Sequence, residues 1–91
     1  DSWSDFMKFR PIAIYNLISI KPYELFEKGD KWLDHKKTPY WLNRYATLKA
    51  IQDNNIQIQS HRNKALLLLE KAKNDQNSFV RVKAIQVISL F

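Results

Sequence analysis

The chain has 91 residues, 45% of them hydrophobic and 13% aromatic, a composition that fits one small folded domain and excludes a disordered chain. One Gly and three Pro leave little material for β-hairpins, and the lack of Cys excludes disulfides and thiolate zinc sites. The net charge of +6 permits binding to nucleic acid, although abundant Lys, Asn and Ile also match the coding of an AT-rich genome, the interpretation we favour.

The first predicted helix spans residues 4–20, with Ser4 as its N-cap. Pro11 lies inside this pattern and predicts either a kink or the true start of the helix. The predicted apolar stripe consists of Phe6, Phe9, Ala13, Leu17 and Ile20.

The second predicted helix begins at Pro22, a residue suited to the first helical position. Its apolar stripe consists of Leu25, Phe26, Gly29, Trp32 and Leu33. Because Gly29 costs helix propensity yet lies on the apolar face, we expect a neighbouring helix to approach closely there.

The third predicted helix begins at Thr38-Pro39, read as a capping hydroxyl followed by Pro. Its stripe consists of Trp41, Tyr45, Leu48 and Ile51. The polar residues 52–55 end it.

The fourth predicted helix covers residues 56–73 and buries Ile58, Ala65, Leu66, Leu69 and Ala72. The last predicted helix is capped by Ser78; residues 80–84 alternate like a strand, but the alternation breaks at Ala84-Ile85, so a helix is preferred. On this helix Val80, Ala84, Val87 and Ile88 are expected to face the preceding helix, and Val82, Ile85 and Phe91 a following one.

An internal repeat relates three of these segments. Residues 10–17 read RPIAIYNL, residues 44–51 read RYATLKAI, and residues 81–88 read RVKAIQVI. Arg10, Arg44 and Arg81 begin the three matches, at separations of 34 and 37 residues. A small residue one turn after each Arg lets a second helix come close.

Residues 62–91, RNKALLLLEKAKNDQNSFVRVKAIQVISLF, resemble the HEAT repeat, an antiparallel helix pair that stacks into a superhelix. The family places an Asp six residues before its Arg, as Asp75 and Arg81 are placed here, and the resemblance implies that the pair ties successive repeats together. The middle unit departs from this pattern, since Thr38 stands at the equivalent position before Arg44. The first unit has only its second helix, and Asp5 lies five residues before Arg10. The tetratricopeptide repeat has a similar period, but its Trp/Leu-Gly/Tyr pattern is missing.

The resemblance implies an all-α, right-handed α-α superhelix of about five helices in a single domain. Its units would be residues 4–20, an orphan helix, and the two complete pairs 22–53 and 57–91. Because the array begins within a repeat, we expect the chain to be part of a longer protein.

No catalytic, cofactor-binding or metal-binding residue is expected in this segment. His35 and His61 have no second ligand at helical spacing, and no His-Glu-x-x-His motif or glycine-rich phosphate loop occurs. The longest apolar run, residues 65–69, is far shorter than the roughly 20 residues of a membrane span. The sequence does not identify a compartment.

The sequence therefore predicts a non-catalytic scaffold that packs against another domain of the same chain or a protein partner. PYWLNRYATLKAI and SFVRVKAIQVI look loosely similar to the C-terminal helical repeats of aminopeptidase N-type zinc metallopeptidases, whose zinc site would lie outside these residues. The alternative is a nucleic-acid-binding module, with Arg10, Arg44 and Arg81 as a ladder toward phosphates and Trp3, Trp32 and Trp41 stacking on bases. Its further basic surface would consist of Lys36, Lys37, Arg62, Lys64, Lys71, Lys73 and Lys83. We favour packing roles for these arginines and tryptophans.

Overall fold

The computed structural model describes residues 10–91, so the expected cap at Ser4 and the stripe positions Phe6 and Phe9 lie outside the described residues. The helices are α2 (Pro11–Ile20), α3 (Glu24–Trp32), α4 (Trp41–Asp53), α5 (Asn55–Ile58), the 3-10 helix η1 (Gln59–His61), α6 (Arg62–Ala72) and α7 (Ser78–Ile88). Residues 10–91 contain no strand, which confirms the all-α class and the helix over residues 80–84.

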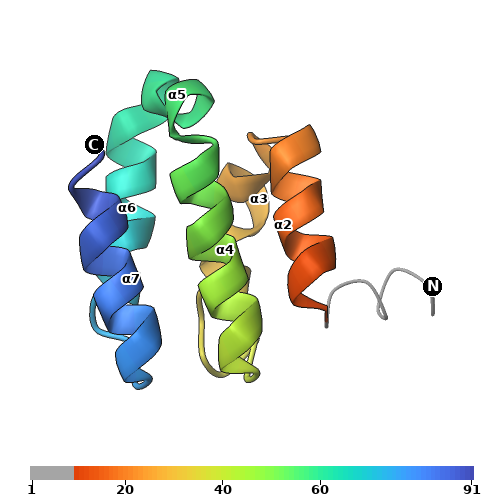
Figure 1. The fold of residues 1–91 in the computed structure, drawn as a ribbon, viewed down its shortest axis with the longest axis vertical. Helices are drawn as coiled ribbons and strands as arrows, with labels where there is room; N and C mark the ends of the chain where they lie inside the picture. The colour runs from red at the N-terminus through yellow and green to blue at the C-terminus, as the bar shows by residue number, and fades with distance from the viewer. Residues whose placement is uncertain (1–9) are drawn as a thin grey trace.

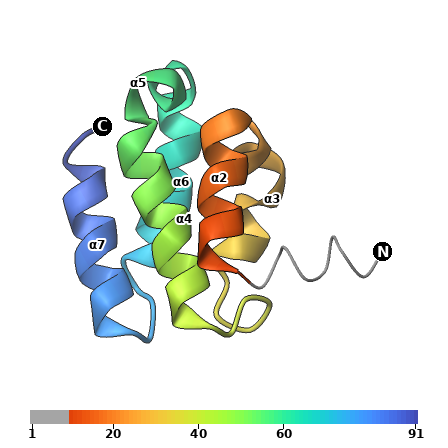
Figure 2. The same cartoon turned by 45° about the vertical axis from the view of Figure 1, so that its right-hand side comes forward.

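The helices form two layers (Figure 1). Helices α2, α4 and α7 lie side by side in one layer, with α4 in the middle, and α3 and α6 lie behind them. The view turned by 45° in Figure 2 shows the same order. The shortest dimension is 17 Å, which suits two helix layers whose axes are about 8–10 Å apart.

The core lies between the two layers and receives a fully buried aliphatic side chain from each of the five longer helices. These residues are Ile18, Leu25, Leu48, Leu69 and Val80. Burying one such side chain contributes about 1.5–3 kcal/mol, so the core depends on both layers being present.

The first described helix begins at Pro11, so this Pro marks a helix start rather than a kink within 11–20. The predicted stripe was wrong at Ile20, which is 77% exposed at the end of α2. The buried side chains of α2 are Ala13, Ile14 and Ile18, so Ala13 of the predicted stripe is buried while Leu17 is only partly buried.

Helix α4 begins at Trp41, later than the predicted signal at Thr38-Pro39. The Thr38 hydroxyl does not cap this helix; it donates a hydrogen bond to the carbonyl oxygen of Lys31 at 2.7 Å. A residue that precedes Pro is disfavoured in the helical region, which keeps Thr38 outside the helix.

The predicted helix over 56–73 is interrupted, because α5 and η1 precede α6. Within α6 the buried leucines are Leu68 and Leu69, whereas Leu66 is only partly buried. The cap of α7 is Asn77 rather than Ser78: its side-chain oxygen accepts hydrogen bonds from the backbone N–H groups of Phe79 and Val80.

Gly29 confirms the expected close approach of two helices. A Cβ atom placed on Gly29 would lie 2.8 Å from Cδ1 of Leu68. Helix α6 therefore packs directly on the bare backbone of α3.

Candidate functional site on α4 and α7

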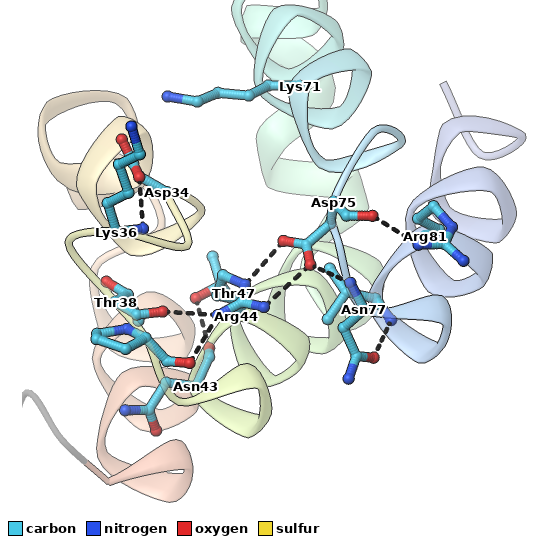
Figure 3. A network of polar contacts seen from close by, with 12 residues as sticks. Asp34, Lys36, Thr38, Asn43, Arg44, Thr47, Lys71, Asp75, Asn77 and Arg81 are labelled. Atoms are coloured by element: carbon cyan, nitrogen blue, oxygen red, sulfur yellow. Dashed lines mark hydrogen bonds and ion pairs between the residues drawn. The ribbon is translucent and has the colours of Figure 1, made fainter.

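The guanidinium group of Arg44 is fully buried in the centre of the fold. Its Nε and Nη2 atoms donate hydrogen bonds to the two carboxylate oxygens of Asp75, at 2.7 and 3.0 Å (Figure 3). Both side chains are almost completely buried. This two-point contact joins α4 to the turn between α6 and α7.

The remaining donor atom of Arg44 binds the turn before its own helix. Nη1 donates to the carbonyl oxygens of Thr38 and Pro39, at 2.8 and 3.0 Å. On the other side of the pair, Asp75 Oδ1 also accepts a hydrogen bond from the backbone N–H of Asn77, at 2.8 Å. Each of the three guanidinium nitrogens therefore has an acceptor, which compensates the cost of burying the charge.

Arg81 repeats one of these contacts in α7. Its Nη1 atom donates to the carbonyl oxygen of Asp75, six residues earlier, at 2.9 Å, just as Nη1 of Arg44 donates to Thr38, also six residues earlier. The main chain of Asp75 thus meets Arg81, while its carboxylate meets Arg44 (Figure 3). Sequence spacing associated Asp75 with Arg81 but did not reveal the contact with Arg44, 31 residues earlier.

Helix α4 presents a row of side chains to α7. The ring of Trp41 stacks on Phe79, with centroids 5.4 Å apart, and the ring of Tyr45 lies 5.5 Å from Nζ of Lys83. Lys83 also donates to Oε1 of Gln52 at 3.0 Å. This face of α4 is thereby covered.

The repeat-related side chains on α7 are uncovered. Val82 and Ile85 correspond to Tyr45 and Leu48, 37 residues earlier. Leu48 is fully buried, whereas Val82 and Ile85 are each 55% exposed. We name the row Ser78, Val82, Ile85 and Ser89 the outer face of α7; all four residues are exposed.

Most of the predicted basic surface is engaged within the fold. Arg62 donates to the carbonyl oxygen of Phe91, Lys73 pairs with Glu70 at 2.8 Å, and Lys71 lies 3.4 Å from the carbonyl oxygen of Asp30. Lys64 lies over the ring of Phe26, and Lys83 lies between α4 and α7. Lys36 and Lys37 are exposed in the α3–α4 turn.

The predicted ladder of arginines and the predicted row of tryptophans do not form continuous exposed surfaces, because their members differ in burial. Arg44 is buried, Arg81 is partly buried and Arg10 is exposed beside the start of α2. Trp32 is buried in the core, Trp41 is partly buried, and Trp3 lies outside the described residues. The buried Arg44 has no access to a phosphate.

The two histidines lie apart from these features. His61 packs edge-on against the rings of Tyr23 and Phe26, each 5.1 Å away, and His35 is exposed. Within residues 10–91 there is no group of three or more His, Cys, Asp or Glu placed to hold a metal ion.

Two pKa shifts reflect local structural contacts. A hydrogen bond from the Tyr15 hydroxyl to Asp53, at 2.5 Å, raises the pKa of Tyr15 and joins α2 to α4. The backbone N–H of Lys36 donates to Asp34 Oδ1 at 2.8 Å and lowers the pKa of Asp34. The second contact holds the α3–α4 turn closed.

These features define the molecule as an all-α protein of two helix layers, with a buried Arg–Asp pair and an uncovered face on α7 that has Val82 and Ile85 at its centre. Comparison of the chain with protein-family models, with curated proteins and with solved structures finds no significant match. None of the helices described between residues 10 and 91 is long and apolar enough to cross a bilayer.

Proposed function

We propose that this chain is a non-catalytic helical-repeat scaffold, built as a HEAT-like superhelix, that packs against another domain of its own protein or a protein partner. The observation that carries the proposal is the shared contact of Arg44 and Arg81, each of which binds the carbonyl oxygen six residues earlier. The neighbouring helices α4 and α7 therefore share the same hydrogen bond between an Arg side chain and the turn that precedes the helix.

The exposed side chains of α7 support a packing role. A unit of a repeat array cannot bury its apolar face alone and relies on the next unit to cover it. Val82 and Ile85 lie on such a face, since at the related positions of α4 Tyr45 contacts Lys83 of α7 and Leu48 is fully buried. An adjoining domain or protein would remove these apolar surfaces from water.

A zinc aminopeptidase is the parent protein that we propose within this class. The proposal depends on the loose similarity of PYWLNRYATLKAI and SFVRVKAIQVI to the C-terminal helical repeats of such enzymes. In that case the zinc site belongs to another part of the protein, and this chain supplies packing surface alone.

Light scattering over a range of protein concentrations tests the scaffold proposal. An uncovered packing face should make the wild-type chain associate as its concentration rises, and Val82→Lys with Ile85→Lys should restore a monomer. The matched control is Ile56→Lys, because Ile56 is 82% exposed but lies on α5. A wild-type chain that stays monomeric throughout, or a control that acts as strongly as the α7 variant, contradicts the proposal.

The nucleic-acid alternative predicts a different result. Binding of labelled duplex DNA, followed by fluorescence anisotropy at two salt concentrations, should weaken with a log–log slope of about −0.9 per phosphate neutralised. No binding at low salt would exclude this alternative, and steep salt-dependent binding would replace the scaffold proposal with it.

A further inference from the structure

The outer face of α7 repeats the face of α4 on which α7 itself packs. On α4 the row is Trp41, Tyr45, Leu48 and Gln52, and three of its members contact α7 through the ring stack, the Lys83–ring contact and the Lys83 hydrogen bond. The row 37 residues later is Ser78, Val82, Ile85 and Ser89, exposed throughout. The two faces have the same spacing and an apolar centre.

The guanidinium of Arg81 completes the correspondence. In Arg44, Nη1 binds the preceding turn while Nε and Nη2 bind the carboxylate of Asp75. In Arg81, Nη1 binds the preceding turn in the same way. Within residues 10–91, no hydrogen bond or ion pair joins Nε or Nη2 of Arg81 to another residue.

We propose that the outer face of α7 binds a helix whose preceding turn carries an Asp or Glu, and that this carboxylate forms a two-point contact with Nε and Nη2 of Arg81. The inference rests on the proposed function and names the chemistry of the partner. The model for the partner is within the chain: α7 and its turn residue Asp75, as they pack on α4.

The partner requires both an acidic turn and an apolar helix face. Val82 and Ile85 attract an apolar surface without fixing its register, because hydrophobic burial has no direction. The planar guanidinium of Arg81 supplies register, since it accepts a carboxylate in only one geometry. A partner helix with a neutral turn would leave the Arg81 charge without a carboxylate at the edge of a desolvated interface, which disfavours it.

A tandem extension of the chain tests the proposal with a defined probe. A second copy of residues 55–91 is appended directly after Phe91, which lies 37 residues after Asn54, so the added helices start in the register of the original ones. Denaturant unfolding is then measured for the original and the extended chain at concentrations where both are monomeric. The extended chain should unfold in one transition at a higher denaturant midpoint.

Substitution of Arg81 gives the decisive comparison. Arg81→Met should lower the folding equilibrium constant at least about tenfold more in the extended chain than in the original, because only the extended chain supplies a carboxylate. In the added copy, replacing the Asp that corresponds to Asp75 with Asn should remove most of this extra loss. Arg81→Lys should recover only part of it, since Lys keeps the charge but not the two-point geometry.

The remaining outcomes separate this inference from the proposed function. Two independent unfolding transitions would show that the added unit does not dock on α7, and would overturn the inference. If the extended chain unfolds in a single transition and Arg81→Met lowers the folding equilibrium constant equally in both chains, the requirement for an acidic turn is overturned. The proposal of a helical scaffold would still stand.

Discussion

Arg44 and Asp75 lie 31 residues apart in the chain and form a buried two-point ion pair, with donor–acceptor distances of 2.7 and 3.0 Å. The pair joins the central helix α4 to the turn that precedes α7. Because burying two charges costs nearly as much as their attraction returns, such a pair contributes more to register than to net stability. It fixes where the α6–α7 unit sits along α4.

Breaking this pair should be costly. Asp75→Asn leaves the Arg44 charge buried without a carboxylate and should lower the free energy of unfolding by about 3–5 kcal/mol. Urea denaturation followed by circular dichroism measures the change. Lys73→Met is the matched control, since the Lys73–Glu70 pair is roughly half exposed and should contribute less than about 1 kcal/mol.

The double variant Arg44→Met with Asp75→Leu removes both charges together. It should be less destabilised than the sum of its two single variants, because neither charge is left alone in the core. Additive effects of the two substitutions would show that the pair does not act as a unit.

Asn43 is a buried residue whose replacement should stabilise the fold. It is 1% exposed, and within residues 10–91 neither its amide nitrogen nor its amide oxygen has a hydrogen-bond partner. The repeat-related residue on α7 is the fully buried Val80. Asn43→Leu, of similar shape, should raise the free energy of unfolding by about 1–3 kcal/mol, measured by urea denaturation, because it removes an unpaired buried amide.

Asn54→Leu is the control for Asn43→Leu, because the side chain of Asn54 is hydrogen-bonded. Its amide nitrogen donates to Ser19 Oγ at 3.1 Å and to the carbonyl oxygen of Ala50 at 2.8 Å. Asn54→Leu should therefore destabilise the protein. A destabilising Asn43→Leu would contradict the assignment of the Asn43 side chain as unpaired among residues 10–91.

Gly29 and Leu68 should show strong coupling. Gly29→Ala gains up to about 1 kcal/mol of helix propensity but places a Cβ 2.8 Å from Leu68 Cδ1, so the gain is offset in the wild-type background. In a Leu68→Ala background the same substitution should stabilise the protein by part of that amount, since Leu25 Cδ1 still lies 3.3 Å from the added Cβ. Thermal and urea unfolding of the four chains in this cycle measure the coupling, and an equal effect of Gly29→Ala in both backgrounds would refute the steric argument.

Asp34 should give the α3–α4 turn a pH-dependent stability. The folded state lowers the pKa of Asp34, chiefly through the hydrogen bond from the backbone N–H of Lys36. This contribution is therefore present above the unfolded pKa of about 3.9 and is lost as pH falls through the lower folded value. The difference in unfolding free energy between wild type and Asp34→Ala should be positive at neutral pH and shrink in acid.

Asp34→Asn separates the charge from the hydrogen bond. It keeps an acceptor oxygen that does not titrate, so it should lose less stability at neutral pH than Asp34→Ala. Urea denaturation at pH 7 and pH 3 compares the three chains. A wild-type advantage over Asp34→Ala that is equal at both pH values would contradict the assignment.

Much of the helical layout followed from local patterns. The scarcity of Gly and Pro, the stripes at helical spacing and the repeated Arg segments predicted an all-α chain, and the bare face of Gly29 predicted a close helix contact. The same patterns placed Val82, Ile85 and Phe91 on the outward side of the last helix. Val82 and Ile85 are exposed there, but the prediction was wrong for Phe91, which lies beyond the end of α7 and packs against the core. Periodicity predicts such features because it depends only on residues a few positions apart.

Helix ends and burial were predicted less well, because they depend on competing contacts. The Thr38-Pro39 pattern predicts a cap at Thr38, but the Thr38 hydroxyl donates to the carbonyl oxygen of Lys31 and the helix begins at Trp41. Ile20 fits the apolar spacing of its helix, yet α2 ends there and leaves it exposed.

Local sequence specifies the helices, because propensity and periodicity act within a turn or two of the chain. The partner of Arg44, in contrast, depends on how the helices pack. A guanidinium can bind any carboxylate within reach, and the packing of α6 and α7 against α4 brings Asp75, 31 residues away, to Nε and Nη2. The same packing covers Leu48 and leaves Ile85 exposed, since burial depends on which helix lies alongside.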